Sequence, residues 1–391
     1  MDFSFTPEQE RFRQEICAFL ERELSPREER QLAGAAGTGN VDKEFSRKLG
    51  RKGWIGLAWP REHGGQGLGH IERLIYMEEM VLNTAPIGYH HAAERQMGPS
   101  IIMFGTPEQK RDFLPRIARG ECGFAIGYSE PGTGSDLASL ETRAMEDGDD
   151  FVINGTKIWT SLAHVDDYIW LAARTNMEAP KHRGISVFLV DLKLPGVTIR
   201  PIVNMAGLAE FNQVTFDNVR VPKSTMVGER ERGWYVVAAN LDFERAGIER
   251  VAGNWPLFQD VVQYLGQRRV NGGRATDDPR VRNRIAETAI EYTVGKLLCY
   301  RVAWMQEQGV VPNREASVSK LFGTEASQRM ARTCMDLMGL YGQLQHGEPW
   351  APIRGRVERA WHWAVSATIA GGTSEVLRNV IALRGLGLPR G

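Results

Sequence analysis

The chain has few cysteines, no net charge and no long apolar run. Four cysteines among 391 residues are scattered without a CxxC pair, which argues against a zinc site and a disulfide framework. The 48 basic residues balance 48 acidic ones, whereas a dedicated nucleic-acid binder would carry a basic excess. No run of about 18 apolar residues occurs, so no membrane insertion is predicted.

Two further signals are missing. The N-terminus lacks the basic and then apolar pattern of a secretory signal, and together with the reduced thiols this predicts a cytoplasmic protein. The histidines show no metal-ligand spacing with carboxylates or cysteines, so no metal is predicted. Glycine, in contrast, is abundant at 42 residues, about 11 % against a usual value of roughly 7 %. This excess predicts tight turns or backbone held close to a ligand.

The order of local patterns predicts three domains. Residues 1–121 read as helical, and Thr6 and Gln9 have the spacing of a capping box at the start of the first helix. Residues 122–228 are rich in β-branched and aromatic segments without helices between them, which predicts an antiparallel sheet or barrel. Residues 229–391 read as long helices that form a bundle. The predicted fold is therefore an α+β multidomain chain.

Local patterns also place individual elements. Asn154-Gly155 lies between two apolar segments and has the signature of a two-residue hairpin turn. Residues 28–42 read as a flexible connection, and residues 59–67 carry too many breakers to be helical. Helices are predicted around 71–83, 107–119, 233–269, 278–308, 312–342, 357–369 and 374–384, and strands at 150–158, 167–173, 185–191 and 212–221.

Three motifs resemble those of the acyl-CoA dehydrogenase family. The segment 127–136, GYSEPGTGSD, resembles the first signature of the family, and 369–379, IAGGTSEVLRN, resembles its glycine-threonine segment near the C-terminus. The segment 157–161, KIWTS, stands where the family has a tryptophan that stacks on the flavin. The motifs occur in the family's order across nearly the whole chain. The resemblance implies an N-terminal helical domain, a middle β-barrel and a C-terminal four-helix bundle.

The resemblance also implies an activity. Family members remove the α-proton of an acyl-CoA thioester and pass the β-hydrogen as hydride to FAD, which yields the 2,3-enoyl-CoA. It further implies an electron-transferring flavoprotein as electron acceptor and an oligomer, by default a tetramer, of one or two kinds of chain. The reaction requires a carboxylate base, and a base of this kind contributes roughly 10²–10⁴-fold to the rate.

Several residues match the family's cofactor-binding positions. By resemblance, the Ile126 and Tyr128 backbone groups and the Ser129 hydroxyl face the flavin. Ser135 lies near the diphosphate and the entering acyl-CoA, and Trp159 packs on the flavin ring. Hydroxyls and glycine-flanked backbone N–H groups suit an anionic cofactor. Further FAD contacts are expected from Ser161, Thr373, Glu375 and, in a stretch that departs from the family's pattern, Arg274.

The position of the family's usual catalytic glutamate is occupied by Gly371, which has no side chain. By resemblance, the Gly371 backbone N–H still donates to the thioester oxygen. The missing side chain also leaves space beside the flavin for a bulky or ring-bearing acyl group. The base must then come from elsewhere in the chain or from another chain.

Glu244 is the candidate base within this chain. On the helix predicted from residue 233, it shares one inward-facing stripe with the apolar residues Trp234, Val237, Leu241 and Ile248. Burial there would raise the pKa of the carboxyl toward neutrality, as a general base requires. The segment 241–245, LDFER, also resembles the isovaleryl-CoA and long-chain branch, in which this helix carries the catalytic glutamate. The same match implies that Asp242 and Arg245 contact the CoA moiety; an ion pair of Glu244 with a nearby arginine is the structural alternative.

Two other functions stay open. The chain is alternatively a non-catalytic or half-site subunit of a heteromeric acyl-CoA dehydrogenase, whose partner chain supplies the base. A flavin monooxygenase on the same fold is the other alternative. Branched-chain, long-chain, aromatic and steroid side-chain acyl groups are all compatible with the sequence.

Overall fold

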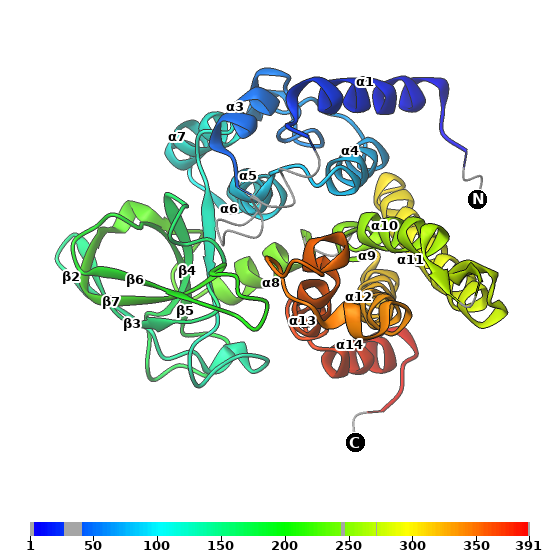
Figure 1. Cartoon of the computed structure of the whole chain (residues 1–391). Coiled ribbons are helices and arrows are strands. Elements are labelled where there is room, and N and C mark those ends of the chain that lie inside the picture. The colour runs from blue at the N-terminus through cyan, green and yellow to red at the C-terminus, as the bar shows by residue number, and fades with distance from the viewer. Residues whose placement is uncertain (1–3, 27–40, 244–246, 271, 390–391) are drawn as a thin grey trace.

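The computed structural model describes residues 4–26, 41–243, 247–270 and 272–389, without the side chains of Asp242 and Phe243. Glu244 and Arg245 lie outside the described residues, as does most of the predicted connection at 28–42. Figure 1 shows the N-terminal helices in blue, a curved sheet in green at one side and the C-terminal helices from yellow to red at the other. This arrangement confirms the predicted order of helical, β and helical parts.

The N-terminal helices begin where the sequence places capping signals. The Thr6 hydroxyl accepts a hydrogen bond from Gln9 N at 3.2 Å, and the Gln9 side chain accepts one from Thr6 N at 3.1 Å, so the predicted capping box is confirmed. Thr106 and Gln109 form a second one. The elements are α1 (Pro7–Glu23), α3 (Lys43–Arg51), α4 (His70–Leu82), α5 (Gly88–Ala92), a π-helical turn (Ala93–Met97), α6 (Gly98–Phe104) and α7 (Pro107–Ala118).

The middle part is one sheet with the strand order β6-β7-β3-β2-β4-β5-β8, and β1 pairs with β4. Most pairs are antiparallel, but β1 and β2 run parallel to β4. Successive strand residues point to opposite faces of the sheet, so the sheet has a core on each face. Phe188 packs in the core formed by the strands themselves. Trp170 packs in the core that the sheet shares with the helices. The strands are β1 (Phe124–Gly127), β2 (Arg143–Asp147), β3 (Asp150–Lys157), β4 (Tyr168–Arg174), β5 (Ile185–Asp191), β6 (Val197–Ile202), β7 (Phe211–Pro222) and β8 (Met226–Val227).

The predicted hairpin turn at Asn154-Gly155 is wrong. Both residues lie inside β3, and the pairing register with β7 shifts between Ile153 and Gly155. Only glycine suits this irregular position, because the φ of Gly155 is 149° and a Cβ there would come within 2.5 Å of the Thr142 hydroxyl. The real turn joins β2 to β3 around Gly148, which has a φ of 63°. Glycine within a strand pattern therefore marks a bulge here rather than a turn.

The C-terminal part is helical as predicted, but the helix expected over 233–269 is divided. It forms α8 (Gly233–Phe243), α9 (Glu249–Ala252) and α10 (Trp255–Gln267), and the poor helix formers Gly247 and Gly253 fall near the divisions. Ile248 therefore does not continue the predicted stripe along α8. The other elements are β9 (Arg269–Val270), β10 (Gly273–Arg274), α11 (Pro279–Glu307), α12 (Asn313–Met338), α13 (Arg356–Ala367) and α14 (Ser374–Val380).

The α8 helix is the element that connects the sheet to the C-terminal helices, and it lies between them in Figure 1. Val236, Val237 and Asn240 are buried along it, while Trp234 and Leu241 pack at the edge of the main core. None of the described helices has both the length and the apolar character that crossing a bilayer requires.

Candidate active site

The signature loop, residues 127–136, lies directly beside the segment 157–161. Ile158 N donates a hydrogen bond to Ser129 O at 2.9 Å, and Lys157 Nζ donates one to Tyr128 O at 3.1 Å. The two motifs are 20 to 30 residues apart in sequence, and these hydrogen bonds join the residues that follow β1 to the end of β3. Ser129 is half-buried and Ser135 is exposed at the far end of the loop.

A buried ion pair anchors the signature loop. Lys157 Nζ lies 2.7 Å from Glu130 Oε1, and the two side chains are 0 % and 6 % exposed. The Glu130 carboxylate also accepts hydrogen bonds from Glu141 N and Thr142 N at 2.6 and 2.9 Å. Burial raises the pKa of the Glu130 carboxyl, but the Lys157 ammonium and the hydrogen bonds outweigh it, so the pKa lies below its ordinary value. Burial lowers the pKa of the Lys157 ammonium to about 8, which leaves it protonated at neutral pH, so the pair is charged and joins the two motifs.

Trp159 is held in a strained and exposed position. Its φ is 59°, in the left-handed region that bulky residues rarely adopt, and its side chain is 57 % exposed. The next residue is clamped: Thr160 and Asn212 exchange two backbone hydrogen bonds of 3.0 Å, and Asn212 Nδ2 donates a third to Thr160 O at 2.9 Å. These hydrogen bonds hold the strained backbone in place, and the face of the Trp159 ring stays available for a planar ligand.

A lysine of α12 supports the glycine loop, residues 369–373. Gly371 and Gly372 have φ values of 64° and 93°, which favour glycine. The buried side chain of Lys320, on α12, donates to Gly372 O at 2.6 Å and to Ala367 O at 3.3 Å. Sequence reasoning missed Lys320, because a single lysine in a helical pattern gives no sign of its partner.

A hollow of about 380 Å³ opens beside the glycine loop, between α12 and α14. Thr373 and Glu375 border it, together with the ion pair of Arg378 and Glu325 at 2.7 Å. Ser374 also lines the hollow, although its hydroxyl oxygen is buried and has no hydrogen-bond partner among the described residues. A buried hydroxyl without a protein partner is commonly satisfied by ordered water.

A contact between domains joins the two regions. Trp363 Nε1, on α13, donates to Glu210 Oε2 at 2.8 Å, and Glu210 O accepts from Leu162 N at 2.8 Å. Leu162 follows Ser161, so the segment with Trp159 reaches the helix that precedes the glycine loop. Arg274, in contrast, lies in the β9–β10 hairpin between α10 and α11.

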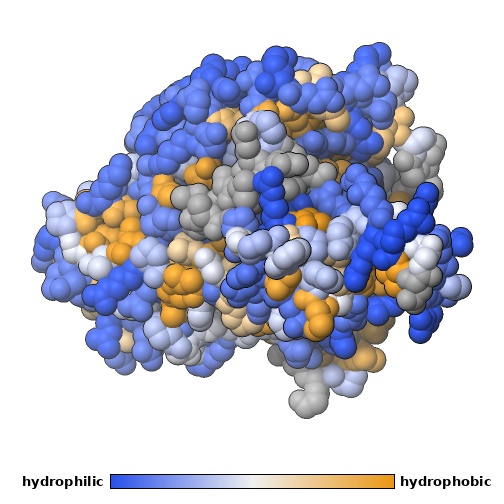
Figure 2. All heavy atoms as spheres, in the orientation of Figure 1, coloured by the Kyte–Doolittle hydropathy of each residue, from blue (hydrophilic) through white to orange (hydrophobic). Residues whose placement is uncertain are grey.

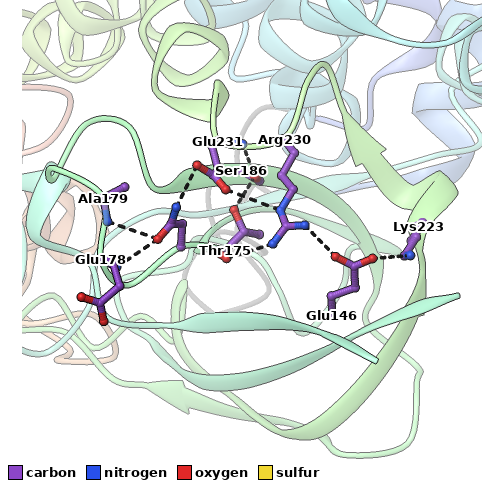
Figure 3. A network of polar contacts seen from close by, with 9 residues as sticks. Glu146, Thr175, Glu178, Ala179, Ser186, Lys223, Arg230 and Glu231 are labelled. Atoms are coloured by element: carbon purple, nitrogen blue, oxygen red, sulfur yellow. Dashed lines mark hydrogen bonds and ion pairs between the residues drawn. The ribbon is translucent and has the colours of Figure 1, made fainter. Parts of the chain in front are cut away.

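The start of α8 is anchored to the sheet by the polar network in Figure 3. Glu231 N donates to Ser186 Oγ at 2.9 Å, and Glu231 Oε2 accepts from Asn176 Nδ2 at 3.0 Å. Arg230 next to it pairs with Glu146 at 2.6 Å, and Glu146 also pairs with Lys223. These contacts fix where α8 leaves the sheet. Asp242 lies in its last described turn, and the Glu244 and Arg245 assignments fall on residues outside the described ones.

Comparison with known proteins identifies the class. Family models described as the N-terminal, middle and C-terminal domains of acyl-CoA dehydrogenase match residues 6–121, 125–219 and 231–386. The chain belongs to the acyl-CoA dehydrogenase family. It is therefore an oxidoreductase that acts on CH–CH groups, and its cofactor is FAD.

Individual relatives match over the full length. The chain is 39 % identical over 401 residues to acyl-CoA dehydrogenase FadE26 of Mycobacterium tuberculosis, with 100 % of this chain and 99 % of the relative covered. A solved structure titled Tcur3481-Tcur3483 steroid ACAD is 36 % identical with a TM-score of 0.92, and all of both chains is covered. The ChsE4-ChsE5 complex from Mycobacterium tuberculosis is 39 % identical with a TM-score of 0.91, again over all of both chains.

The residues present fit FAD. The exposed face of Trp159 offers a stacking surface for a planar ring, and Ser129, Ser161 and Thr373 offer hydroxyls. Thr373 and Glu375 border the hollow of about 380 Å³ beside the glycine loop, and this volume suits part of such a cofactor. The individual FAD contacts assigned from the resemblance stay predictions.

Lys320→Met is expected to weaken FAD binding at least about tenfold, because the glycine loop loses the hydrogen bond at Gly372 O and the end of α13 loses the one at Ala367 O. A hydrogen bond from a charged donor is worth about 1.5–3 kcal/mol. Fluorescence titration of the apoprotein with FAD measures the effect. Lys193→Met, which changes an exposed lysine of the middle domain, is the control and should leave the affinity unchanged. Equal affinities of the two variants would show that Lys320 does not support the cofactor site.

Proposed function

We propose that this chain dehydrogenates a bulky acyl-CoA with Glu244 as the base. The observation that carries the proposal is the path of α8. The Tyr128 hydroxyl, in the signature loop, donates a hydrogen bond to Asn240 Oδ1 on α8 at 2.9 Å, and Glu244 follows Asn240 by four residues in the sequence. The helix thus leads from the signature loop to the proposed base, whereas Gly371 has no side chain that acts as one.

In the proposed reaction each group has one task. The Glu244 carboxylate takes the α-proton, and the electron pair of that C–H bond forms the Cα=Cβ double bond. The Gly371 N–H donates to the thioester oxygen, where negative charge develops. The chemistry that FAD supplies when bound is acceptance of the β-hydrogen as hydride. Asp242 and Arg245 contact the CoA moiety, and an electron-transferring flavoprotein accepts the electrons.

A ring-bearing acyl group, of the steroid side-chain type, is the proposed substrate class. Gly371 supports it, because the missing side chain leaves room beside the flavin site. The similarity to a structure titled as a steroid ACAD supports the same class. A small straight-chain acyl group would leave that space unfilled and forfeit the contacts with its lining.

The proposed assembly is an oligomer with a second kind of subunit. Ile290, Val294, Leu297 and Trp304 are exposed apolar residues of α11, and their spacing places them on one side of the helix. Figure 2 shows apolar patches that interrupt the hydrophilic surface on one face of the molecule. The titles of two similar structures each name a pair of proteins, which supports a heteromer over a homotetramer.

The domain boundaries at 121/122 and 228/229 belong to the same proposal. They are supported by the element order, since β1 begins at Phe124 and α8 begins at Gly233.

Anaerobic bleaching of the flavin by a panel of CoA thioesters tests the proposed function. The protein is purified alone and with a co-expressed relative, and straight-chain, branched, aromatic and steroid side-chain acyl-CoAs are compared. The expected result is a yellow protein that the ring-bearing thioesters bleach fastest.

Other outcomes select the alternatives. A colourless chain that is stable only with its partner, and active only when the partner carries the base, is a half-site subunit, as the two-protein titles also allow. A chain that consumes oxygen with reduced flavin supplied, and that no acyl-CoA bleaches, is a monooxygenase.

A further inference from the structure

Five buried polar side chains meet where the three parts of the chain join. Gln96 lies in the π-helical turn, Ser100 on α6, Tyr128 at the end of β1, Trp170 on β4 and Asn240 on α8. We call them the Asn240 cluster. All are buried, and Gln96, Ser100, Trp170 and Asn240 are fully so. A π-helical turn is rare and is often found near functional sites.

Asn240 is the centre of the cluster. Its Nδ2 donates to Ser100 Oγ at 3.0 Å, and its Oδ1 accepts from the Tyr128 hydroxyl at 2.9 Å. Gln96 Nε2 reaches the same Oδ1 at 3.3 Å and the Asn240 backbone oxygen at 3.4 Å. Trp170 Nε1 in turn donates to the Tyr128 hydroxyl at 3.1 Å. One amide therefore joins α8 to two helical segments and to the signature loop.

A packing role alone does not require this amide. An apolar side chain would fill the same volume without the desolvation cost that a buried amide must recover through hydrogen bonds. Hydrogen bonds, unlike apolar contacts, are directional, so the bonds made by Asn240 specify one arrangement of the elements that they join. The element held here is α8, and the residues just before it are already anchored by the hydrogen bond from Glu231 N to Ser186 Oγ. With Asn240 the helix is held at both ends.

We propose that Asn240 is a positioning residue for the dehydrogenation: it holds α8, which leads to the base, in register with the signature loop that carries Tyr128. The proposal rests on the proposed function, in which Glu244 is the base four residues beyond Asn240. Asn240 itself takes no proton and acts through the placement of that carboxylate.

Two variants remove the link from opposite sides. Asn240→Leu removes the amide. Tyr128→Phe removes only the hydroxyl that reaches this amide, and the remaining ring keeps its packing. At saturating acyl-CoA, each is expected to slow flavin reduction roughly 10- to 100-fold, since misplacement of a reacting group by about 1 Å has an effect of this size. The dissociation constant of acyl-CoA changes less than about threefold, and FAD stays bound.

The isotope effect separates positioning from general loss of stability. With α-deuterated acyl-CoA, both variants should show a larger primary isotope effect than the wild type, because removal of the α-proton becomes slower than the other steps. Relative to Asn240→Leu alone, the double variant should be slowed by much less than additivity of the two changes predicts, because both break the same Tyr128–Asn240 hydrogen bond. Asn254→Leu is the matched control: it removes the hydrogen bond of Asn254 to Ser327 at 2.9 Å, between α10 and α12, and should change neither rate nor isotope effect.

The outcomes distinguish the positioning role of Asn240 from the assignment of Glu244 as the base. If Glu244→Gln reduces its flavin at the wild-type rate, the assignment of the base fails. If Glu244→Gln is inactive but Asn240→Leu and Tyr128→Phe keep the wild-type rate and isotope effect, the positioning role fails while the base stands. A rise in the dissociation constant of acyl-CoA with an unchanged reduction rate would also overturn it, because Asn240 would then serve binding.

Discussion

Glu244→Gln is expected to keep FAD bound and to abolish bleaching by acyl-CoA. Glutamine matches the size of glutamate but its amide takes up no proton at neutral pH, so the α-proton has no acceptor. Loss of a general base lowers the rate by roughly 10²–10⁴-fold. Anaerobic stopped-flow absorbance of the flavin measures the rate of reduction, and the visible spectrum before mixing measures the bound cofactor.

Two further variants control this experiment. Glu229→Gln changes an exposed glutamate just before α8 and should leave the reduction rate unchanged. Gly371→Glu, added to Glu244→Gln, places a carboxylate at the position where the family usually has its base. A side chain at this φ of 64° costs about 1–2 kcal/mol. Bleaching regained in the double variant would place the α-carbon within reach of both positions, and wild-type bleaching by Glu244→Gln alone would refute the assignment.

Lys157→Met is expected to have the largest effect on stability. It leaves the Glu130 carboxylate buried without its counter-charge, and breaking a buried pair from one side costs about 3–5 kcal/mol. Chemical denaturation at neutral pH, followed by tryptophan fluorescence, measures the free energy of unfolding. The exposed pair of Lys181 and Asp136 at 2.9 Å provides the control, because Lys181→Met should cost less than about 1 kcal/mol.

The pH dependence of the same variant should change sign. In the wild type the pKa of Glu130 is lowered on folding, so its contribution to stability is present above the ordinary glutamate pKa of about 4.3 and is lost as the pH falls. Without Lys157, only the hydrogen bonds from Glu141 N and Thr142 N oppose burial, which is the largest single cause of the shift. We therefore expect the pKa of Glu130 to rise, so that the variant loses stability as the pH rises instead. Glu130→Gln added to Lys157→Met should recover part of the loss. A variant as stable as Lys181→Met would show that the ion pair does not anchor the loop.

The sequence predicts the domain order and most helices and strands because these depend on local signals. The capping signal at Thr6 and the β-branched and aromatic composition of 185–191 can be recognised without knowing what they contact elsewhere in the chain. The two errors have different causes. Gly155 is a turn residue by propensity, but its neighbours pair with β7 on both sides. The expected helix over 233–269 is divided near Gly247 and Gly253, where periodicity alone gives no stop.

The candidate site is predicted in part. The three motifs carry enough sequence to be recognised, and their residues at Ser129, Trp159 and Thr373 line the regions described above. Their supports were missed, since Lys320 and Gln96 act only through partners that are distant in the sequence. Asn240 does carry a local signal, because it is a single amide directly after the apolar run 234–239. A lone amide in such a run signals a buried hydrogen-bonded group.

The Asn240 cluster also limits how this protein can be recombined. Its side chains come from helices before the sheet, from the sheet and from the first helix after it, so exchange of any one part with a relative replaces some members and keeps the rest. A chimera whose donor lacks the partner of Asn240 would bury an unsatisfied amide at the point where all three parts meet. Productive chimeras should therefore inherit Gln96, Ser100, Tyr128 and Asn240 as a set.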